Sequence, residues 1–175
     1  ITINTSTTGT IIVANAIDIN GFASEVAAAF AAIDTNTGNA TATITYADYT
    51  VAQLKAINNA TTGAITLSTT NTALSGDATD LAEALAGTIN YTGNVTVIDT
   101  AYTVSELKAI NAGTTGEINL NNTGVDLTGT AADLVSAFAG TITTHTGDIT
   151  ITDTPTDAQL AIIDAATTGT ITYSE

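Results

Sequence analysis

The chain has 175 residues, of which 44% are hydrophobic, so it carries enough apolar material for a folded core. The chain has 17 acidic residues and only two basic ones, which gives a formal charge of −15. This charge argues against nucleic acids and anionic membranes as partners. The absence of cysteine excludes disulfides, thiol catalysis and cysteine-based zinc sites. No apolar run approaches the roughly 18 residues needed to cross a bilayer, so membrane insertion is not expected.

The first residues, Ile1-Thr2-Ile3-Asn4, contain neither an initiator methionine nor a signal peptide. We therefore interpret the sequence as a segment of a longer polypeptide. Alternation of apolar and polar residues predicts an end strand at Ile1-Thr2-Ile3 and another at Ile171-Thr172-Tyr173, and we expect neighbouring repeats to stack on both. The stretch from Thr7 to Val13 resembles the tail of a further repeat.

Two kinds of helix are predicted to alternate along the chain. Thr50, Thr103 and Thr156 are each followed three residues later by Gln or Glu, which is the capping box that satisfies free backbone N–H groups in a first helical turn. These threonines start the helices that we call first-type. The first-type helices are predicted at residues 50–60, 103–112 and 156–166.

The second-type helices carry different end signals. Asp77 and Thr130 are the predicted N-caps, and Gly87 and Gly140 are predicted to end their helices in the left-handed conformation that glycine tolerates. The second-type helices are predicted at residues 22–32, 77–86 and 130–139.

Short strands are predicted between the helices. Ile65 and Leu67 flank Thr66, and a period of two places the aliphatic side chains inward and the threonine outward. A Thr-Gly pair that indicates a tight turn precedes most of the strands. Strands are predicted near residues 39–45, 64–68, 94–98, 117–121, 148–152 and 170–173, with a seventh in the tail before residue 14. Leu74-Ser75-Gly76 and Asp126-Leu127-Thr128-Gly129 are predicted to add short extended pieces before their helices.

The sequence repeats with a fixed period. Gly63, Gly116 and Gly169 lie at 53-residue intervals, each within a Thr-Thr-Gly-x-Ile motif. Because short parallel strands alternating with helices imply right-handed crossovers, we predict one domain over residues 1–175. The predicted fold is a right-handed α/β solenoid resembling leucine-rich repeats, with about seven parallel strands in one sheet backed by about six short helices. Each unit contains two half-units, a half-unit being one helix with the strand that follows it.

Stacking of equivalent half-units predicts two separate aliphatic ladders through the sheet. The first is expected to contain Ile11, Ile65, Ile118 and Ile171, and the second Ala40, Val95 and Ile149.

Some residues could act in catalysis or ligand binding, and for each of them we compare that role with a structural one. His145, the only histidine, lies before a strand without an evident nucleophile, and it is interpreted as a surface substituent rather than a catalytic group. Paired carboxylates of the kind that glycosidases use are not clustered in the sequence. We therefore predict no catalytic, cofactor-binding or metal-binding residues, and no enzyme.

Two further patterns leave alternatives open. Asp48, Asp99 and Asp153 follow strands, and Asn39, Asn94 and Asp148 follow Thr-Gly turns, so these oxygens could bind calcium between layers, although turn and cap formation is the simpler interpretation. Outward side chains could form a regular array that binds a surface, or could simply favour strands. The predicted outward row contains Thr66, Thr96, Asn119, Thr150 and Thr172.

The motif Leu-Lys-Ala-Ile-Asn followed by Thr-Thr-Gly-x-Ile-Thr-Leu, together with Asp-Leu-x-x-Ala-x-Ala-Gly-Thr-Ile, resembles repeats of giant cell-surface proteins of marine cyanobacteria and related bacteria. The resemblance covers residues from about 20 to 175. It implies a long, secreted, non-enzymatic surface protein linked to adhesion or motility. We expect a structural module that acts as a stiff spacer or coat, and the alternative is an adhesin-type module that binds glycan or another surface through the sheet face or the loops.

Overall fold

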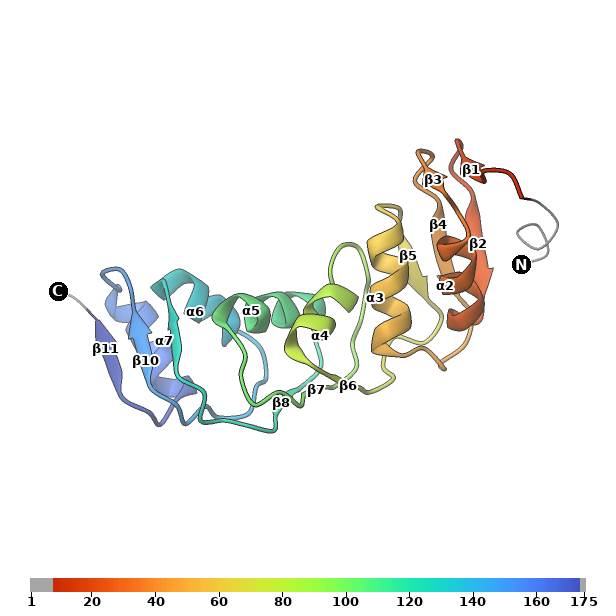
Figure 1. Ribbon diagram of the computed structural model, residues 1–175. Helices are drawn as coiled ribbons and strands as arrows, with labels where there is room; N and C mark the ends of the chain where they lie inside the picture. Colours follow the sequence, from red (N-terminus) through yellow and green to blue (C-terminus); the bar gives the residue numbers. More distant parts are fainter. Residues whose placement is uncertain (1–7, 174–175) are drawn as a thin grey trace.

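The computed structural model describes residues 8–173. The strand predicted at Ile1-Thr2-Ile3 lies outside the described residues. Figure 1 shows the elements following one another from the N-terminal to the C-terminal end of an elongated molecule.

The described part contains six helices at the six predicted places. The first-type helices are α3 (Val51–Ala60), α5 (Val104–Gly113) and α7 (Asp157–Ala166). The second-type helices are α2 (Ala23–Ala31), α4 (Ala78–Ala84) and α6 (Ala131–Ala137). Each helix contacts the next helix along the chain, so the helices form a continuous row.

Eleven short strands accompany these helices between residues 8 and 173. The strands are β1 (Ile12–Val13), β2 (Asp18–Gly21), β3 (Thr35–Asn36), β4 (Thr41–Ile44), β5 (Ile65–Leu67), β6 (Leu74–Gly76), β7 (Val95–Val97), β8 (Ile118–Leu120), β9 (Leu127–Gly129), β10 (Ile149–Ile151) and β11 (Ile171–Tyr173). All pairings between them are parallel. The predicted mixed α/β fold with parallel strands is therefore confirmed, including the extended pieces at β6 and β9. The predicted number of about seven strands is too low, because β6 and β9 are strands and because β2 and β3 were not predicted.

The prediction of one sheet is wrong, because the strands of the described region divide into four sheets. Three of them are three-stranded, with the orders β2-β4-β5, β6-β7-β8 and β11-β10-β9, and β1 pairs with β3. The division occurs where β5 is followed by β6 and β8 by β9. Strands β5 and β8 each pair with a strand of the preceding half-unit, whereas β6 and β9 each pair with a strand of the following half-unit. The ladder of paired strands therefore does not continue from β5 to β6 or from β8 to β9.

The two predicted aliphatic ladders are also wrong. Val95 pairs with Ile118, and Ile149 pairs with Ile171, so strands of the two half-unit types alternate within one ladder. Ile65 pairs with Ala42, whereas Ala40 lies outside the strand. The physical reason is that consecutive half-units, rather than consecutive 53-residue units, are neighbours in space.

The predicted capping boxes at Thr50, Thr103 and Thr156 are confirmed. Thr130 also accepts a hydrogen bond from the Asp133 backbone N–H, at 3.2 Å. Asp77 occupies the predicted N-cap position, although its side chain makes no capping hydrogen bond.

The ends of the second-type helices differ partly from the predictions. Gly87 adopts a left-handed φ of 74°, as expected, whereas Gly140 is not left-handed. Both helices end earlier than predicted, because Leu85 and Phe138 form the C-caps and are buried in the core.

The Thr-Gly turns bring successive backbones into direct contact. A Cβ atom added to Gly116 would collide with the carbonyl of Gly93, and one added to Gly169 would collide with the carbonyl of Gly147. Beside these turns, Thr114 donates its hydroxyl hydrogen to the Gly93 carbonyl at 2.8 Å. The glycines therefore permit an approach that no larger residue allows.

We predict that Gly116→Ala lowers the free energy of unfolding by about 1–3 kcal/mol, because its methyl group overlaps the Gly93 carbonyl. Urea unfolding followed by circular dichroism measures the change. Gly124→Ala is the matched control, since the atoms nearest to its added Cβ lie at an ordinary 3.7 Å. Equal effects of the two substitutions would contradict this account of the turns.

Candidate functional site

The outward side chains of the strands are the first candidate for a binding surface. Thr96 is in register with Asn119, and Thr150 is in register with Thr172, with 3.3 Å between the two hydroxyl oxygens of the second pair. Thr66 lies in a different sheet, beside Thr43. Four of the five residues predicted to form one row are thus brought together as two pairs, and Thr66 lies apart from them.

This outward surface is narrow. In three-residue strands such as β10, the central Thr150 is exposed while Ile149 and Ile151 on either side are buried. Each such strand therefore contributes one outward side chain, so the sheets β6-β7-β8 and β11-β10-β9 each present a single row only three strands wide. The four-residue strands β2 and β4 add one further outward side chain each in the remaining three-stranded sheet. A crystalline surface would require a wider two-dimensional array of equally spaced groups.

Two of the aspartates considered for calcium accept hydrogen bonds at the starts of second-type helices. Asp99 accepts a hydrogen bond from the Ala78 backbone N–H at 2.6 Å, and Asp153 accepts one from the Ala131 N–H at 2.7 Å. Each carboxylate thus satisfies the first backbone N–H of a second-type helix from the end of the strand that follows that helix in the same half-unit. Asp77 is hydrogen-bonded to Asp99, and this contact raises the pKa of the Asp77 carboxyl.

The residues after the Thr-Gly turns also link successive layers. Asn94 Oδ1 accepts from the Glu117 backbone N–H at 3.1 Å, and Asp148 Oδ1 accepts from the Thr170 N–H at 2.8 Å. Asn39 Oδ1 accepts from the Thr62 hydroxyl at 2.9 Å. These oxygens are engaged with the backbone or hydroxyls of the next layer. Within residues 8–173, no group of three or more acidic or histidine side chains is arranged to hold a metal ion.

His145 is buried with 0% of its surface exposed, which corrects its interpretation as a surface substituent. Its ring packs edge-on against Tyr102 and also contacts Phe138, with centroid distances of 6.2 and 5.8 Å. The Tyr102 hydroxyl lies 3.4 Å from Nδ1, while Nε2 has no hydrogen-bond partner. No nucleophile accompanies the imidazole in these contacts, so His145 is a core residue.

A second aromatic pair shows that this arrangement recurs. In the preceding unit Tyr49 and Tyr91 pack edge-on at 6.5 Å, with Tyr91 where the later unit has His145. The hydroxyls of Tyr49 and Tyr102 both donate to backbone carbonyls, at 2.7 Å in each case. Burial raises the pKa of the Tyr102 hydroxyl to about 12. Sequence reasoning did not assign these tyrosines a role, although their position directly before a capping threonine was a usable signal.

Both lysines of the chain join successive helices. Lys55 Nζ lies 2.6 Å from Asp80 and 3.1 Å from Glu83, and Lys108 Nζ lies 2.5 Å from Asp133. The hydrogen bond from Lys108 lowers the pKa of the Asp133 carboxyl. These ion pairs are half-exposed, so they add little to the free energy of unfolding. Their main effect is to favour the packing of helices with complementary charges.

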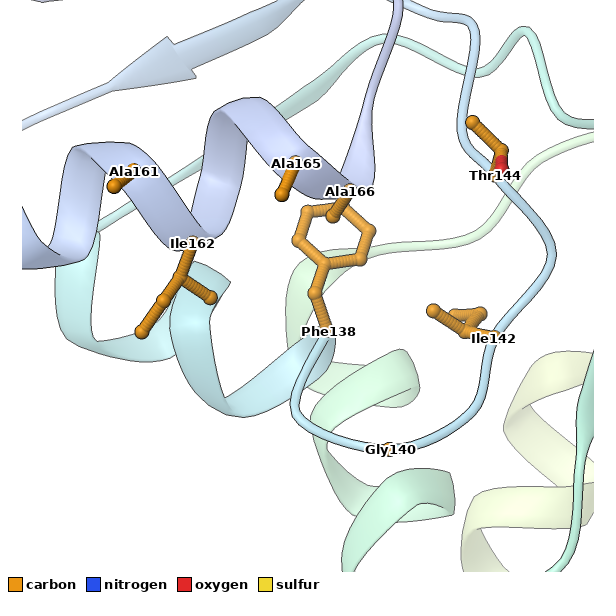
Figure 2. Close-up of a pocket in the computed structure, with 8 residues that line it drawn as sticks. All are labelled: Phe138, Gly140, Ile142, Thr144, Ala161, Ile162, Ala165 and Ala166. Carbon is orange, nitrogen blue, oxygen red and sulfur yellow. The ribbon is translucent and has the colours of Figure 1, made fainter.

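One shallow groove of about 410 Å³ lies between α7 and the loop that follows α6. Figure 2 shows its lining, with Phe138 beneath the end of α7 and Thr144 on the opposite loop. The lining consists of alkyl and aromatic groups, a glycine and the Thr144 hydroxyl. Without an ionisable side chain it offers no general acid or base.

No protein-family model, no curated protein and no solved structure matches the chain. Among the described residues, no helix has the length and apolar character needed to span a bilayer. The arrangement of the candidate residues is therefore the basis for the functional proposal.

We predict that Asp153→Ala lowers the free energy of unfolding by about 1 kcal/mol, because the Ala131 N–H loses its acceptor. Urea unfolding measures the change, and Asp48→Ala is the control, since Asp48 is exposed and outside any helix or strand. If the two variants are equally stable, Asp153 does not cap the start of α6.

We also predict that His145 makes the protein less stable in mild acid. Burial lowers the pKa of its imidazole below 6.5, and the nearby backbone of Val125 and the Asp126 carboxylate oppose the shift only in part. The unfolded chain consequently binds more protons, so the contribution of His145 to stability is complete above pH 6.5 and declines as the pH falls below that value.

Urea midpoints of the wild type and His145→Phe, measured at pH 7.5 and 5.5, test this prediction. The wild type is expected to lose more stability, or gain less, than the variant on acidification. Comparison with the variant removes the shared effect of the many carboxylates. Identical pH dependence in the two proteins would contradict the prediction.

Proposed function

We propose that this chain is a structural repeat module: a right-handed, leucine-rich-repeat-like α/β solenoid that acts as a stiff spacer or coat in a long extracellular surface protein. The observation that carries the proposal is the recurrence of one set of contacts between residues about one half-unit apart. Examples are the Tyr102–Asn122 hydrogen bond across 20 positions and the Lys108–Asp133 contact across 25. Such short-range repetition is characteristic of solenoids.

Stiffness follows from how many kinds of contact join each half-unit to the next. Parallel backbone pairing, stacked Thr-Gly turns and packed helices act on different sides of the chain. Bending the stack in any direction must disturb at least one of these sets. A spacer needs this resistance to bending and does not need a reactive centre.

The surface chemistry supports an inert role. The net charge of −15 makes separate copies of the chain repel one another and so favours solubility. The acidic and amide side chains that could have formed a site are used to join layers, as with Asp153 and Asn94. We propose no catalytic activity, and we propose neighbouring repeats, stacked end to end, as the main partners. The cell-surface location rests on the resemblance of the repeats.

A second candidate is an adhesin-type module, favoured by the exposed hydroxyls in register at Thr150 and Thr172. Such a row could contact a glycan, although its narrow width limits the contact area. Binding of the chain to a glycan array, lost in Thr150→Ala/Thr172→Ala, would support this candidate over the spacer. Surface labelling of intact source cells would test the location for both.

We predict that lengthening the chain lengthens a rod. Duplicating residues 68–120 after Leu120 adds one 53-residue period at an equivalent junction. Because the added period contributes three parallel strands spaced by about 4.8 Å and two helices packed about 8–10 Å apart, the maximum dimension in X-ray scattering should grow by about 10–20 Å while the cross-sectional radius stays constant. An increase in the cross-section without elongation would refute the solenoid.

A further inference from the structure

We propose that the face formed by α7 and β11 is a docking surface for a second-type half-unit of reversed charge, which carries a basic side chain where α4 and α6 carry an acid. The inference rests on the proposed stacking of half-units and specifies the partner at this end. The surface lies at the C-terminal end of the row of elements in Figure 1.

The face has a groove of about 430 Å³ that no residue of the described range 8–173 fills, lined by Leu160, Ala161, Ile171 and Tyr173 and by the carboxylates Asp157 and Asp164. Leu160 and Ile171 are only half-buried, and Tyr173 is 42% exposed. The equivalent residues of the previous first-type half-unit are buried. Those residues are Leu107, Ile118 and Leu120.

A second-type half-unit covers that earlier surface. Helix α6 packs directly on α5, and the backbone N–H of Ile118 donates to the Thr141 carbonyl at 2.8 Å. The structure thus shows, one repeat earlier, how a second-type half-unit packs on a first-type half-unit. A second-type half-unit is accordingly the occupant that fits the shape of the α7 and β11 face.

The chemistry of the α7 face differs at three positions that face the next helix. Helix α5 has Val104, Lys108 and Asn111 there, and α3 has the same three residue types. Lys108 binds Asp133, and Asn111 Nδ2 donates to the Ser136 carbonyl at 2.9 Å. At these positions α7 has Asp157, Ala161 and Asp164.

These substitutions reverse the electrostatic requirement on the partner. Ala161 cannot pair with an acid at the Asp133 position, and Asp164 cannot donate to a helix carbonyl. A Lys or Arg at that partner position would instead lie within one helical turn of both Asp157 and Asp164. In such a pair the acid lies on the first-type helix and the base on the second-type helix, which is the reverse of the Lys108–Asp133 pair.

The same reasoning disfavours a second copy of this chain as the occupant. The second-type helix at its N-terminal end, α2, has Glu25 at the position equivalent to Asp133. Docked on α7, Glu25 would face Asp157 and Asp164 with no lysine between them. Like charges in contact discriminate against such a pairing.

The test extends the full chain with a further half-unit. Residues 121–151 are appended after Tyr173, either unchanged or with Asp133→Lys in the appended copy. Both extensions are also made on a chain with Asp157→Val, Ala161→Lys and Asp164→Asn, which restores the α5 face. Thermal unfolding of the four proteins and of the two unextended chains forms a cycle in which general charge effects cancel.

On the natural face, we expect the lysine extension to have a Tm about 2–4 °C above that of the unchanged extension. On the restored face, the order should reverse. If both extensions stabilise both faces equally, stacking stands and the charge reversal is refuted. If neither extension raises the Tm on either face, the stacking proposal itself fails. Concentration-dependent association of the unextended natural chain in sedimentation would show that a second copy is the occupant instead, and would overturn the proposal.

Discussion

The contact on which the structure depends is the parallel pairing of each half-unit's backbone with the next. Val95 in register with Ile118, and Ile149 with Ile171, place aliphatic side chains side by side on the inner face. This pairing also brings the Thr-Gly turns together, so that Gly93 and Gly116 are in backbone contact. The helices, caps and ion pairs then complete an arrangement whose spacing the backbone has already set.

Local chemistry made much of the fold predictable from sequence. The capping boxes at Thr50, Thr103 and Thr156 marked helix starts correctly, because the motif is satisfied within four residues. Alternation around Thr66 and Thr150 likewise identified strands and their outward faces. In both cases the information that determines the structure lies within the element itself.

The predictions that are wrong or incomplete concern residues whose contacts come from a different part of the stack. Asp77 occupies the N-cap position, but its carboxyl is hydrogen-bonded to Asp99 at the end of the paired strand β7 instead of capping the helix. His145 was interpreted as a surface residue because it lies before a strand without an evident nucleophile, yet Tyr102 and Phe138 pack against it in the core. The division into several sheets has the same origin, since the partners of β5 and β6 lie on opposite sides of the stack.

Most of the polar residues that suggested a binding site serve this stacking. Asp153 and Asn94 bridge layers, and the two lysines link neighbouring helices. What remains exposed is a narrow row of hydroxyls and an end face with its own charge pattern. In the proposed function, the contacts of Asn94 and of the two lysines join each half-unit to the next.

Disulfide trapping in this cysteine-free chain tests the parallel register most directly. Thr96→Cys/Asn119→Cys places two thiols on paired positions of β7 and β8, where parallel strands lie about 4.8 Å apart and within disulfide range. The account predicts rapid oxidation of this pair and slow oxidation of the out-of-register pair Thr96→Cys/Glu117→Cys. Equal rates, or faster oxidation of the second pair, would contradict the stacking of successive half-units.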